Sequence, residues 1–166
     1  MFQTQRLSLR KITLNDAPFI FELLNSPLWL KYIGDRGVAT LEKAEAYIEE
    51  NYLTSYKNGL GNFVVTLVSN SLPIGTCGLY KRKNLEFPDI GFAFLPEYIG
   101  KGYGFEAASA ILEYALKELK LPTLYGITLP ENKASISLLE KLGLQNKGPF
   151  RMEDDSEEIL LFEYSQ

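Results

Sequence analysis

The chain has 166 residues, of which 46% are hydrophobic and 23% charged, and its formal net charge is −4. This balance predicts one soluble globular domain, and the negative charge argues against a nucleic-acid-binding surface. Because the sequence has no histidine and only one cysteine, Cys77, it excludes Ser-His-Asp hydrolases, histidine-ligated zinc enzymes, cysteine-rich metal sites and an intrachain disulfide.

The N-terminal part of the chain contains one predicted strand and two predicted helices. Residues 6–13 (RLSLRKIT) alternate polar and apolar side chains, which predicts a half-buried strand. Residues 17–25 follow a capping Asn-Asp pair and predict a helix, and residues 40–59 predict a second, long helix. Between them, residues 26–37 (SPLWLKYIGDRG) lack a clean period and are predicted to form a loop. Its aromatic side chains either pack onto the domain or line a substrate pocket.

The rest of the chain is predicted to consist mainly of strands, with two further helices. Residues 62–69 and 74–83 flank a turn and predict an antiparallel hairpin. The basic run 81–83 is either a solvated loop or a surface that faces an anionic substrate. The later elements, in order, are a strand at 89–95, a helix ending near 119, a strand at 123–129, a short helix within 131–143, and a hairpin of 144–151 and 159–165 around an acidic turn at 153–158. Because this order does not alternate regularly between strand and helix, it favours a mixed sheet flanked by helices.

Three alternating glycines, Gly100, Gly102 and Gly104, stand just before the helix that ends near residue 119. Glycines permit close approach of the backbone to a ligand, and the unpaired N–H groups of the helix favour an anion such as phosphate. Lys101 adds a positive charge. The spacing fits neither a dinucleotide fingerprint, because Phe105 stands at its third position, nor a P-loop. An ordinary strand-to-helix turn is the alternative.

Two motifs in the sequence resemble those of the GNAT superfamily of acyl-CoA-dependent N-acetyltransferases. The run DIGFAFLPEYIGKGYG is similar to its pyrophosphate motif, which is Arg or Gln, two residues, Gly, one residue, then Gly or Ala. Gly102 and Gly104 match this motif, whereas Ile99 stands where Arg or Gln is usual. The run NKASISLLEKLG is similar to the family's N-x-x-S followed by E-K-L-G. Together with the RLSLRKIT opening it most resembles the RimJ/RimL type, whose known members acetylate protein N-terminal amines, with relatives acting on small amines.

The resemblance covers almost the whole chain and implies a single GNAT-like acetyltransferase domain over residues 1–166. It implies an α/β (α+β) fold with a mixed, mostly antiparallel sheet of about seven strands flanked by about four helices. It also implies acetyl-CoA as co-substrate and direct acetyl transfer to a primary amine. The cofactor-binding residues that it implies are Phe94, Leu95, Ile99, Gly100, Lys101, Gly102, Tyr103, Gly104 and Asn132.

The resemblance also suggests catalytic residues. Many members use a tyrosine to protonate the leaving thiolate, at the position that Leu139 fills here. Ser135, at the serine position of the RimJ/RimL motif, is therefore the candidate proton donor, and a serine that caps its own helix is the alternative. Glu86 and Asp89 are candidate general bases at the start of the strand, with Glu158 weaker. Each of these carboxylates is alternatively a surface residue.

Other functions remain open at this point. Ile99 and Leu139 also fit an acyl-CoA-binding module that has lost catalysis, and the glycine-rich turn fits a nucleotide-binding domain. The expected partners are acetyl-CoA and an amine acceptor, with no metal and no nucleic acid. No apolar run approaches the roughly 20 residues that a membrane span needs, so we expect no membrane partner and a cytoplasmic location. We expect a monomer or a homodimer.

Overall fold

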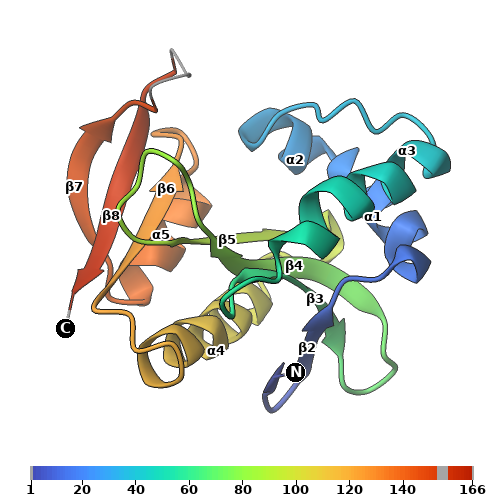
Figure 1. Ribbon diagram of the computed structural model, residues 1–166, viewed down its shortest axis with the longest axis horizontal. Coiled ribbons are helices and arrows are strands. Elements are labelled where there is room, and N and C mark those ends of the chain that lie inside the picture. Colours follow the sequence, from blue (N-terminus) through green and yellow to red (C-terminus); the bar gives the residue numbers. More distant parts are fainter. Residues whose placement is uncertain (1, 153–156, 166) are drawn as a thin grey trace.

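The computed structural model describes residues 2–152 and 157–165, so most of the predicted acidic turn at 153–158 lies outside the described residues. Its centre is one sheet of eight strands in the order β1-β2-β3-β4-β5-β6-β8-β7. Neighbouring strands are antiparallel except β5 and β6, which are parallel. In Figure 1 the strands β6, β8 and β7 run at a steep angle to β4 and β5. The predicted mixed, mostly antiparallel sheet is confirmed, with one strand more than expected.

The elements follow the predicted order, with one additional strand and one additional helix. The strands are β1 (Phe2–Gln3), β2 (Leu7–Lys11), β3 (Gly61–Leu67), β4 (Pro73–Tyr80), β5 (Asp89–Phe94), β6 (Thr123–Thr128), β7 (Gln145–Phe150) and β8 (Ile159–Ser165). The helices are α1 (Ala17–Leu24), α2 (Pro27–Tyr32), α3 (Leu41–Tyr47), α4 (Tyr103–Lys117) and α5 (Lys133–Lys141). The additional strand is β1 and the additional helix is α2. The long helix predicted at 40–59 consists of α3, a π-helical turn at Ile48–Tyr52 and a 3-10 turn at Leu53–Ser55.

The prediction of a loop at residues 26–37 is wrong over Pro27–Tyr32, which forms α2. Six residues are too few to show a helical period, and the packing that holds them is tertiary. Trp29 is only 8% exposed, and its Nε1 donates a hydrogen bond to the Gly34 carbonyl at 3.1 Å. The aromatic side chain therefore packs onto the domain.

Two hydrophobic clusters cover the two faces of the sheet. Because side chains alternate along a strand, Phe63 and Val65 of β3 face one cluster while Val64 faces the other. The cluster with Phe63 contains α4 and α5, and the cluster with Val64 contains α1, α2 and α3. We call these the α4 face and the α1–α3 face.

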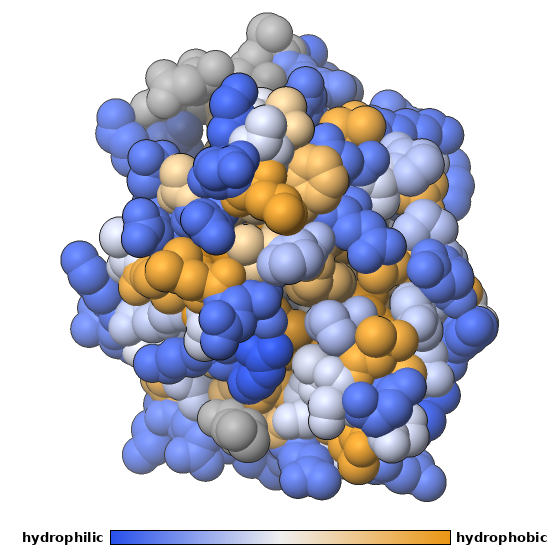
Figure 2. Space-filling view, turned by 90° about the vertical axis from the view of Figure 1, so that its right-hand side faces the viewer, coloured by the Kyte–Doolittle hydropathy of each residue, from blue (hydrophilic) through white to orange (hydrophobic). Residues whose placement is uncertain are grey.

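The surface over α1–α3 is mixed in character. Figure 2 shows hydrophobic residues there as separate patches between hydrophilic ones. Leu30 and Leu41, on α2 and α3, are 43% and 48% exposed. Within the described part of the chain, no helix has the length and apolar character needed to cross a membrane.

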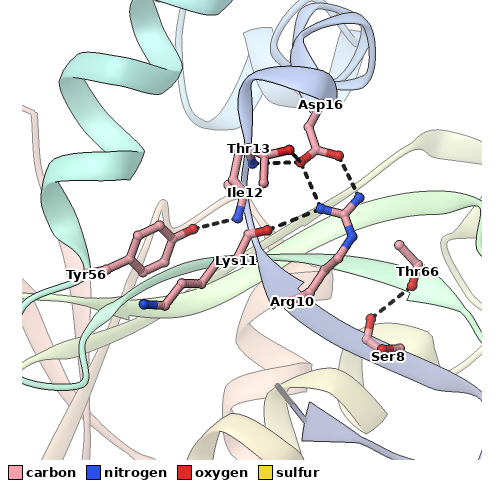
Figure 3. Close-up of polar contacts among 8 residues, drawn as sticks. All are labelled: Ser8, Arg10, Lys11, Ile12, Thr13, Asp16, Tyr56 and Thr66. Carbon is pink, nitrogen blue, oxygen red and sulfur yellow. Dashed lines mark hydrogen bonds and ion pairs between the residues drawn. The ribbon is translucent and has the colours of Figure 1, made fainter.

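A partly buried ion pair fixes the junction between β2 and α1 (Figure 3). The Arg10 guanidinium donates two hydrogen bonds to the Asp16 carboxylate, at 2.8 and 2.7 Å. The backbone N–H and hydroxyl of Thr13 donate to the same carboxylate at 2.8 and 3.1 Å. Burial raises the pKa of Asp16, but the hydrogen bonds from Arg10 and Thr13 outweigh it, so this pKa lies below its usual value.

Replacing the carboxylate tests this junction. Asp16→Asn keeps the shape of the side chain and weakens hydrogen bonds to a charged group, so we expect the free energy of unfolding at pH 7 to fall by about 1–3 kcal/mol. Because folding lowers this pKa, the stabilisation is present above the unfolded pKa and is lost as pH falls through the folded pKa. The curves of wild type and variant therefore converge toward acid pH.

Urea denaturation across pH measures this effect. Glu113→Gln is the matched control, because Glu113 pairs with Lys117 on the exposed face of α4, with side chains 62% and 71% exposed. Glu113→Gln should leave the midpoint of urea denaturation unchanged. Equal stability of Asp16→Asn and wild type at pH 7 would show that the pair contributes nothing.

Candidate active site

The sheet opens between β5 and β6. Their ladder is the only parallel one in the described sheet, and it ends after two pairs, Asp89 with Tyr125 and Ile90 with Gly126. Most residues of β3 and β4 are buried, yet residues 91–93 in the middle of the central strand β5 are partly exposed. An interior strand reaches solvent only where its neighbour has moved away. The two strands therefore diverge beyond Ile90, and we call the opening between them the cleft.

The cleft presents backbone polar groups of β5. The Leu95 N–H donates to the Ile74 carbonyl of β4 at 2.9 Å, so the peptide groups at Leu95 are turned toward β4. Because peptide groups alternate along a strand, those of Phe92 and Phe94 are directed to the other side, where no described strand pairs with them. Of the two predicted backbone contacts, Phe94 thus lies at the cleft, and the N–H of Leu95 is already paired.

The glycine-rich turn leads directly into the N-terminus of α4. Gly100 and Gly102 have φ values of +77° and +81°, in the left-handed region that favours glycine. The first N–H groups of a helix have no helical partner, and here these belong to residues 103–105. A Cβ placed on Gly100 would meet no atom within 4 Å, so the turn borders open space. This arrangement suits a phosphate group.

Arg6, from the turn between β1 and β2, lies against this loop. Its Nε donates to Glu106 Oε2 at 2.6 Å, and its Nη1 donates to the Lys101 carbonyl at 3.0 Å. Its guanidinium stacks 4.5 Å from the centre of the Tyr103 ring. Glu106 Oε1 accepts two further bonds, from the Thr4 hydroxyl at 2.6 Å and the Arg6 N–H at 2.9 Å. The hairpin therefore holds the Lys101 carbonyl in place at the start of α4.

The sequence reasoning missed Arg6 as a site residue. No local pattern links Arg6 to Glu106, because the two are 100 residues apart. Ile99, which stands at the usual arginine position of the motif, is 43% exposed. A Cβ on Gly102 would lie 3.3 Å from Nη2 of Arg6, so a guanidinium does lie beside the loop. This guanidinium comes from the turn between β1 and β2 instead of from position 99.

Helix α5 begins at the same end of the cleft. The Oδ1 of Asn132 accepts the Ser135 N–H at 3.2 Å and so caps the helix. Ser135 does not act as the cap, and in the described structure its hydroxyl has no hydrogen-bond partner. The side-chain oxygen of Asn132 is engaged in the cap, which leaves its Nδ2 group as the donor for a ligand.

Packing directs one face of α5 toward β6 and α4. A Cβ on Gly126 of β6 would lie 2.6 Å from Leu139, and a Cβ on Gly104 of α4 would lie 3.0 Å from Leu138. Ser135 precedes these two leucines by three and four residues, so it lies on the same face of the helix, one turn nearer its N-terminus. This places Ser135 toward the end of β6 that has parted from β5.

The two predicted bases lie elsewhere. Asp89 is 1% exposed, and Arg82 donates to its carboxylate at 2.7 and 3.3 Å. Burial raises the pKa of Asp89, and the charge of Arg82 opposes that rise. Glu86 is exposed on the β4–β5 loop beside a depression of about 610 Å³, and its carbonyl accepts a hydrogen bond from Lys81. Asp89 and Phe94 are at opposite ends of β5, about 17 Å apart.

The other charged residues considered for the site also have partners in the described structure. Lys81 Nζ donates to the backbone carbonyls of Leu85 and Glu86, and Arg82 pairs with Asp89, so the basic run holds its own loop. The carboxylate of Glu158 lies 3.3 Å from Arg151. The structure therefore gathers Phe94, the glycine-rich loop, Asn132 and Ser135 around the cleft, and it keeps the carboxylates away from them.

Comparison with known proteins agrees with this geometry. The model of the acetyltransferase (GNAT) domain matches residues 6–145. YnaD of Bacillus subtilis (strain 168), described as an uncharacterized N-acetyltransferase, is 34% identical over 148 residues, which are 89% of this chain and 84% of YnaD. A GNAT-family acetyltransferase from Bacillus anthracis has a crystal structure with a TM-score of 0.82 at 28% identity, over 98% of this chain and 96% of that one.

A more distant structure shares the fold. RimL, described as a ribosomal L7/L12 α-N-protein acetyltransferase in complex with coenzyme A, has a TM-score of 0.82 at 13% identity, over 98% of this chain and 95% of that one. At this identity the likeness concerns the fold alone. Together with the family match over residues 6–145, these findings lead to one assignment. The chain belongs to the GNAT family of N-acetyltransferases, whose members use acetyl-CoA.

Proposed function

We propose that this protein transfers the acetyl group of acetyl-CoA directly to a primary amine, and that it is of the RimJ/RimL type. The acceptor is a protein N-terminal amine or a small-molecule amine. One observation carries the proposal: the part of β5 that pairs with no described strand lies between a helix N-terminus suited to phosphate and Ser135, whose hydroxyl has no hydrogen-bond partner among the described residues. These are the parts that binding and breaking a thioester require.

In the proposed reaction, the acceptor nitrogen bonds to the thioester carbonyl carbon and the carbon–sulfur bond breaks. The amine loses a proton and the leaving thiolate gains one. A backbone N–H in the Phe94 region is the proposed donor to the carbonyl oxygen, where negative charge develops. Ser135 is the proposed proton donor to the thiolate and recovers its proton from water.

The phosphate end of acetyl-CoA is assigned to the turn and the start of α4. The N–H groups of residues 102–105 and the helix dipole hold the diphosphate. Lys101 and Arg6 supply positive charge, with Arg6 taking over from the arginine that Ile99 replaces. Arg6 also holds the Lys101 carbonyl through a hydrogen bond. With this carbonyl held, the peptide N–H groups of the loop stay available to the diphosphate. The Asn132 Nδ2 group is the proposed donor to the pantetheine arm.

The general base stays a prediction. Glu86 and Asp89 would act through water, since one is exposed on a loop and the other is ion-paired at the far end of β5. An α-amine, with a reference pKa near 8, needs less help to lose its proton than a lysine amine near 10.4. This favours an α-amine or another weakly basic amine. The cytoplasmic location and the monomeric or homodimeric state also stay predictions.

Ligand-induced stabilisation and thiol release together test the function. Acetyl-CoA at about 100 times its Kd should add about 2.7 kcal/mol to the free energy of unfolding, and ATP or NAD at the same concentration should add less. Free-thiol detection should then show CoA release with at least one member of a panel of amines and peptides. Stabilisation without release from any amine would indicate a binding module, and stronger stabilisation by ATP or NAD would overturn the assignment.

Removing the hydroxyl of Ser135 tests its role. Ser135→Ala should lower kcat by about a hundredfold, because the thiolate then leaves without a positioned proton donor. The KM for acetyl-CoA should stay the same. Ser137→Ala is the matched control, since Ser137 is exposed on the same helix, and it should leave kcat unchanged. If both variants have wild-type kcat, Ser135 has no role in proton transfer.

Shortening the cofactor tests Arg6. Arg6→Met should raise the KM for acetyl-CoA by about tenfold, because charge-assisted hydrogen bonds that fix the loop are lost. With S-acetylpantetheine, which carries the thioester without the diphosphate, variant and wild type should have the same KM. Lys117→Met removes a cation at the opposite end of α4, about 21 Å away. It should change neither the KM for acetyl-CoA nor the KM for S-acetylpantetheine. An equal loss with both thioesters would mean that Arg6 acts on the fold rather than on the phosphate site.

A further inference from the structure

A depression of about 610 Å³ lies between the β4–β5 loop and the end of β7. Lys81, Lys83 and Glu86 line it from the loop, and Phe150 and Arg151 line it from the other side. In Figure 1 the loop, in green, arches toward the end of β7 and the start of β8. None of the acetyl-CoA contacts proposed above involves this depression, so it is free for another ligand.

The depression lies on the side of the sheet away from α4. Phe162 of β8 belongs to the hydrophobic cluster on the α4 face. Because side chains alternate along a strand, Ile159, three residues earlier, faces the other side. Phe150 of β7 pairs with Ile159 and shares that side. The depression is therefore on the same side of the sheet as α1, α2 and α3.

The cleft opens onto this side as well. Ile90 of β5 belongs to the cluster on the α4 face, so the partly exposed Gly91 next to it faces away from α4. Thr128, at the end of β6 that has parted from β5, pairs with Leu160 of β8, and Leu160 pairs with Pro149 of β7. Two strand spacings of about 4.8 Å separate Thr128 from Pro149. The depression therefore begins about 10 Å from the cleft.

Positive charge dominates the lining. Lys81, Lys83 and Arg151 are cations, and Glu86 is the one carboxylate among the described lining residues. Arg151 pairs with Glu158 at 3.3 Å, so the surplus charge is that of the two lysines. Lys83 is exposed and has no hydrogen bond or ion pair with any described residue. The Lys81 ammonium donates to two backbone carbonyls of the loop, which are neutral and leave its charge uncancelled.

The loop that carries the two lysines is held in place. Lys81 uses two of its three donors to hold it, and the third remains. Arg82 donates to the carboxylate of Asp89 at 2.7 and 3.3 Å. The ring of Phe87 packs against Tyr125 of β6, with ring centres 6.1 Å apart. An ion that binds beside Lys83 therefore does not have to order the loop first, which favours its affinity.

We propose that this depression binds a negatively charged group of the acceptor, a carboxylate or a phosphate, about 10 Å from the amine that is acetylated. Lys83 and the remaining donor of Lys81 contact this group. A lysine ammonium acts as a point charge, so the site recognises the charge more than the shape of the anion. The acceptor is thus an acidic amine rather than a polyamine, whose second ammonium group the lysines repel. This inference rests on the proposed acetyl transfer.

Two pairs of acceptors that differ in charge test this proposal. One pair is Ala-Ala-Asp amide and Ala-Ala-Asn amide, in which three residues span about 10 Å. The other is 8-aminooctanoate and 8-aminooctanamide, of similar reach. Wild type should have a kcat/KM, measured by CoA release, about fivefold higher for the charged member of at least one pair. Raising NaCl to about 1 M should reduce this preference, because salt screens exposed charges.

A phosphoserine at the third position of the peptide distinguishes the two kinds of anion. Preference for phosphoserine over aspartate indicates a phosphate-bearing acceptor, and the reverse order indicates a carboxylate. Either preference over the neutral asparagine peptide supports the proposal.

Changing one lysine tests the site itself. Lys83→Met should lower the ratio of the two kcat/KM values, charged to neutral, by about threefold, and Lys83→Glu should invert the preference. The KM for acetyl-CoA should stay the same in both variants. Because Lys83 has no partner among the described residues, the Tm should also stay the same. Lys43→Met is the matched control: Lys43 is exposed on α3, outside the depression, and its loss should leave the ratio unchanged.

The carboxylate in the lining provides a test in the opposite direction. Glu86→Gln should raise the ratio of charged to neutral acceptor, because it removes the negative charge beside the lysines. If Glu86 is also the general base, the same variant lowers kcat with both members of a pair. The ratio therefore reports on the depression and kcat on proton removal.

The outcomes distinguish this inference from the proposed acetyl transfer. Equal kcat/KM values within both pairs, or CoA release from other amines only, overturn the inference while the transfer stands. A charge preference that Lys83→Glu leaves unchanged also overturns it, since the charge is then recognised elsewhere. The proposed transfer itself fails, and the inference with it, if no amine releases CoA.

Discussion

The whole site depends on the early end of the β5–β6 ladder. On one side, β5 pairs with β4 along its full length, from Asp89 to Phe94. On the other side, pairing stops after Ile90. Backbone N–H and C=O groups must find partners, and in the middle of a sheet these partners are normally strands. The remaining groups of β5 are therefore available to a ligand, and they are held more rigidly than any loop would hold them.

Packing around glycines lets the helices lie close to the sheet and to each other. The three glycines of the turn have two different roles. Gly100 and Gly102 adopt positive φ values that other residues avoid. Gly104 instead provides room, since a Cβ there would lie 3.0 Å from Leu138 and 3.6 Å from Phe94. One motif thus combines a backbone requirement for phosphate binding with a packing requirement that joins α4, α5 and β5.

Local patterns predicted most of the fold and the position of the glycine-rich turn. The hairpin β3–β4, the strand β5 and helix α4 have clear periods, and the glycine-rich turn lies where its spacing indicated. What the sequence could not reveal depends on distant contacts. Helix α2 is too short to show a period, and the contact of Arg6 with Glu106 joins residues 100 apart.

The two faces of the sheet offer different kinds of chemical groups. In the proposed function, the groups offered to acetyl-CoA on the α4 face are mostly backbone N–H groups, which any sequence with this fold supplies. On the α1–α3 face, the group beside the opening is the side chain of Tyr80, which lies over Gly91 and which substitution can change without altering the strands. Side chains of β5 alternate between the faces, so both faces meet at the same short opening. In the proposed function, the fold therefore fixes the donor of the acetyl group, whereas the choice of acceptor amine depends on side chains.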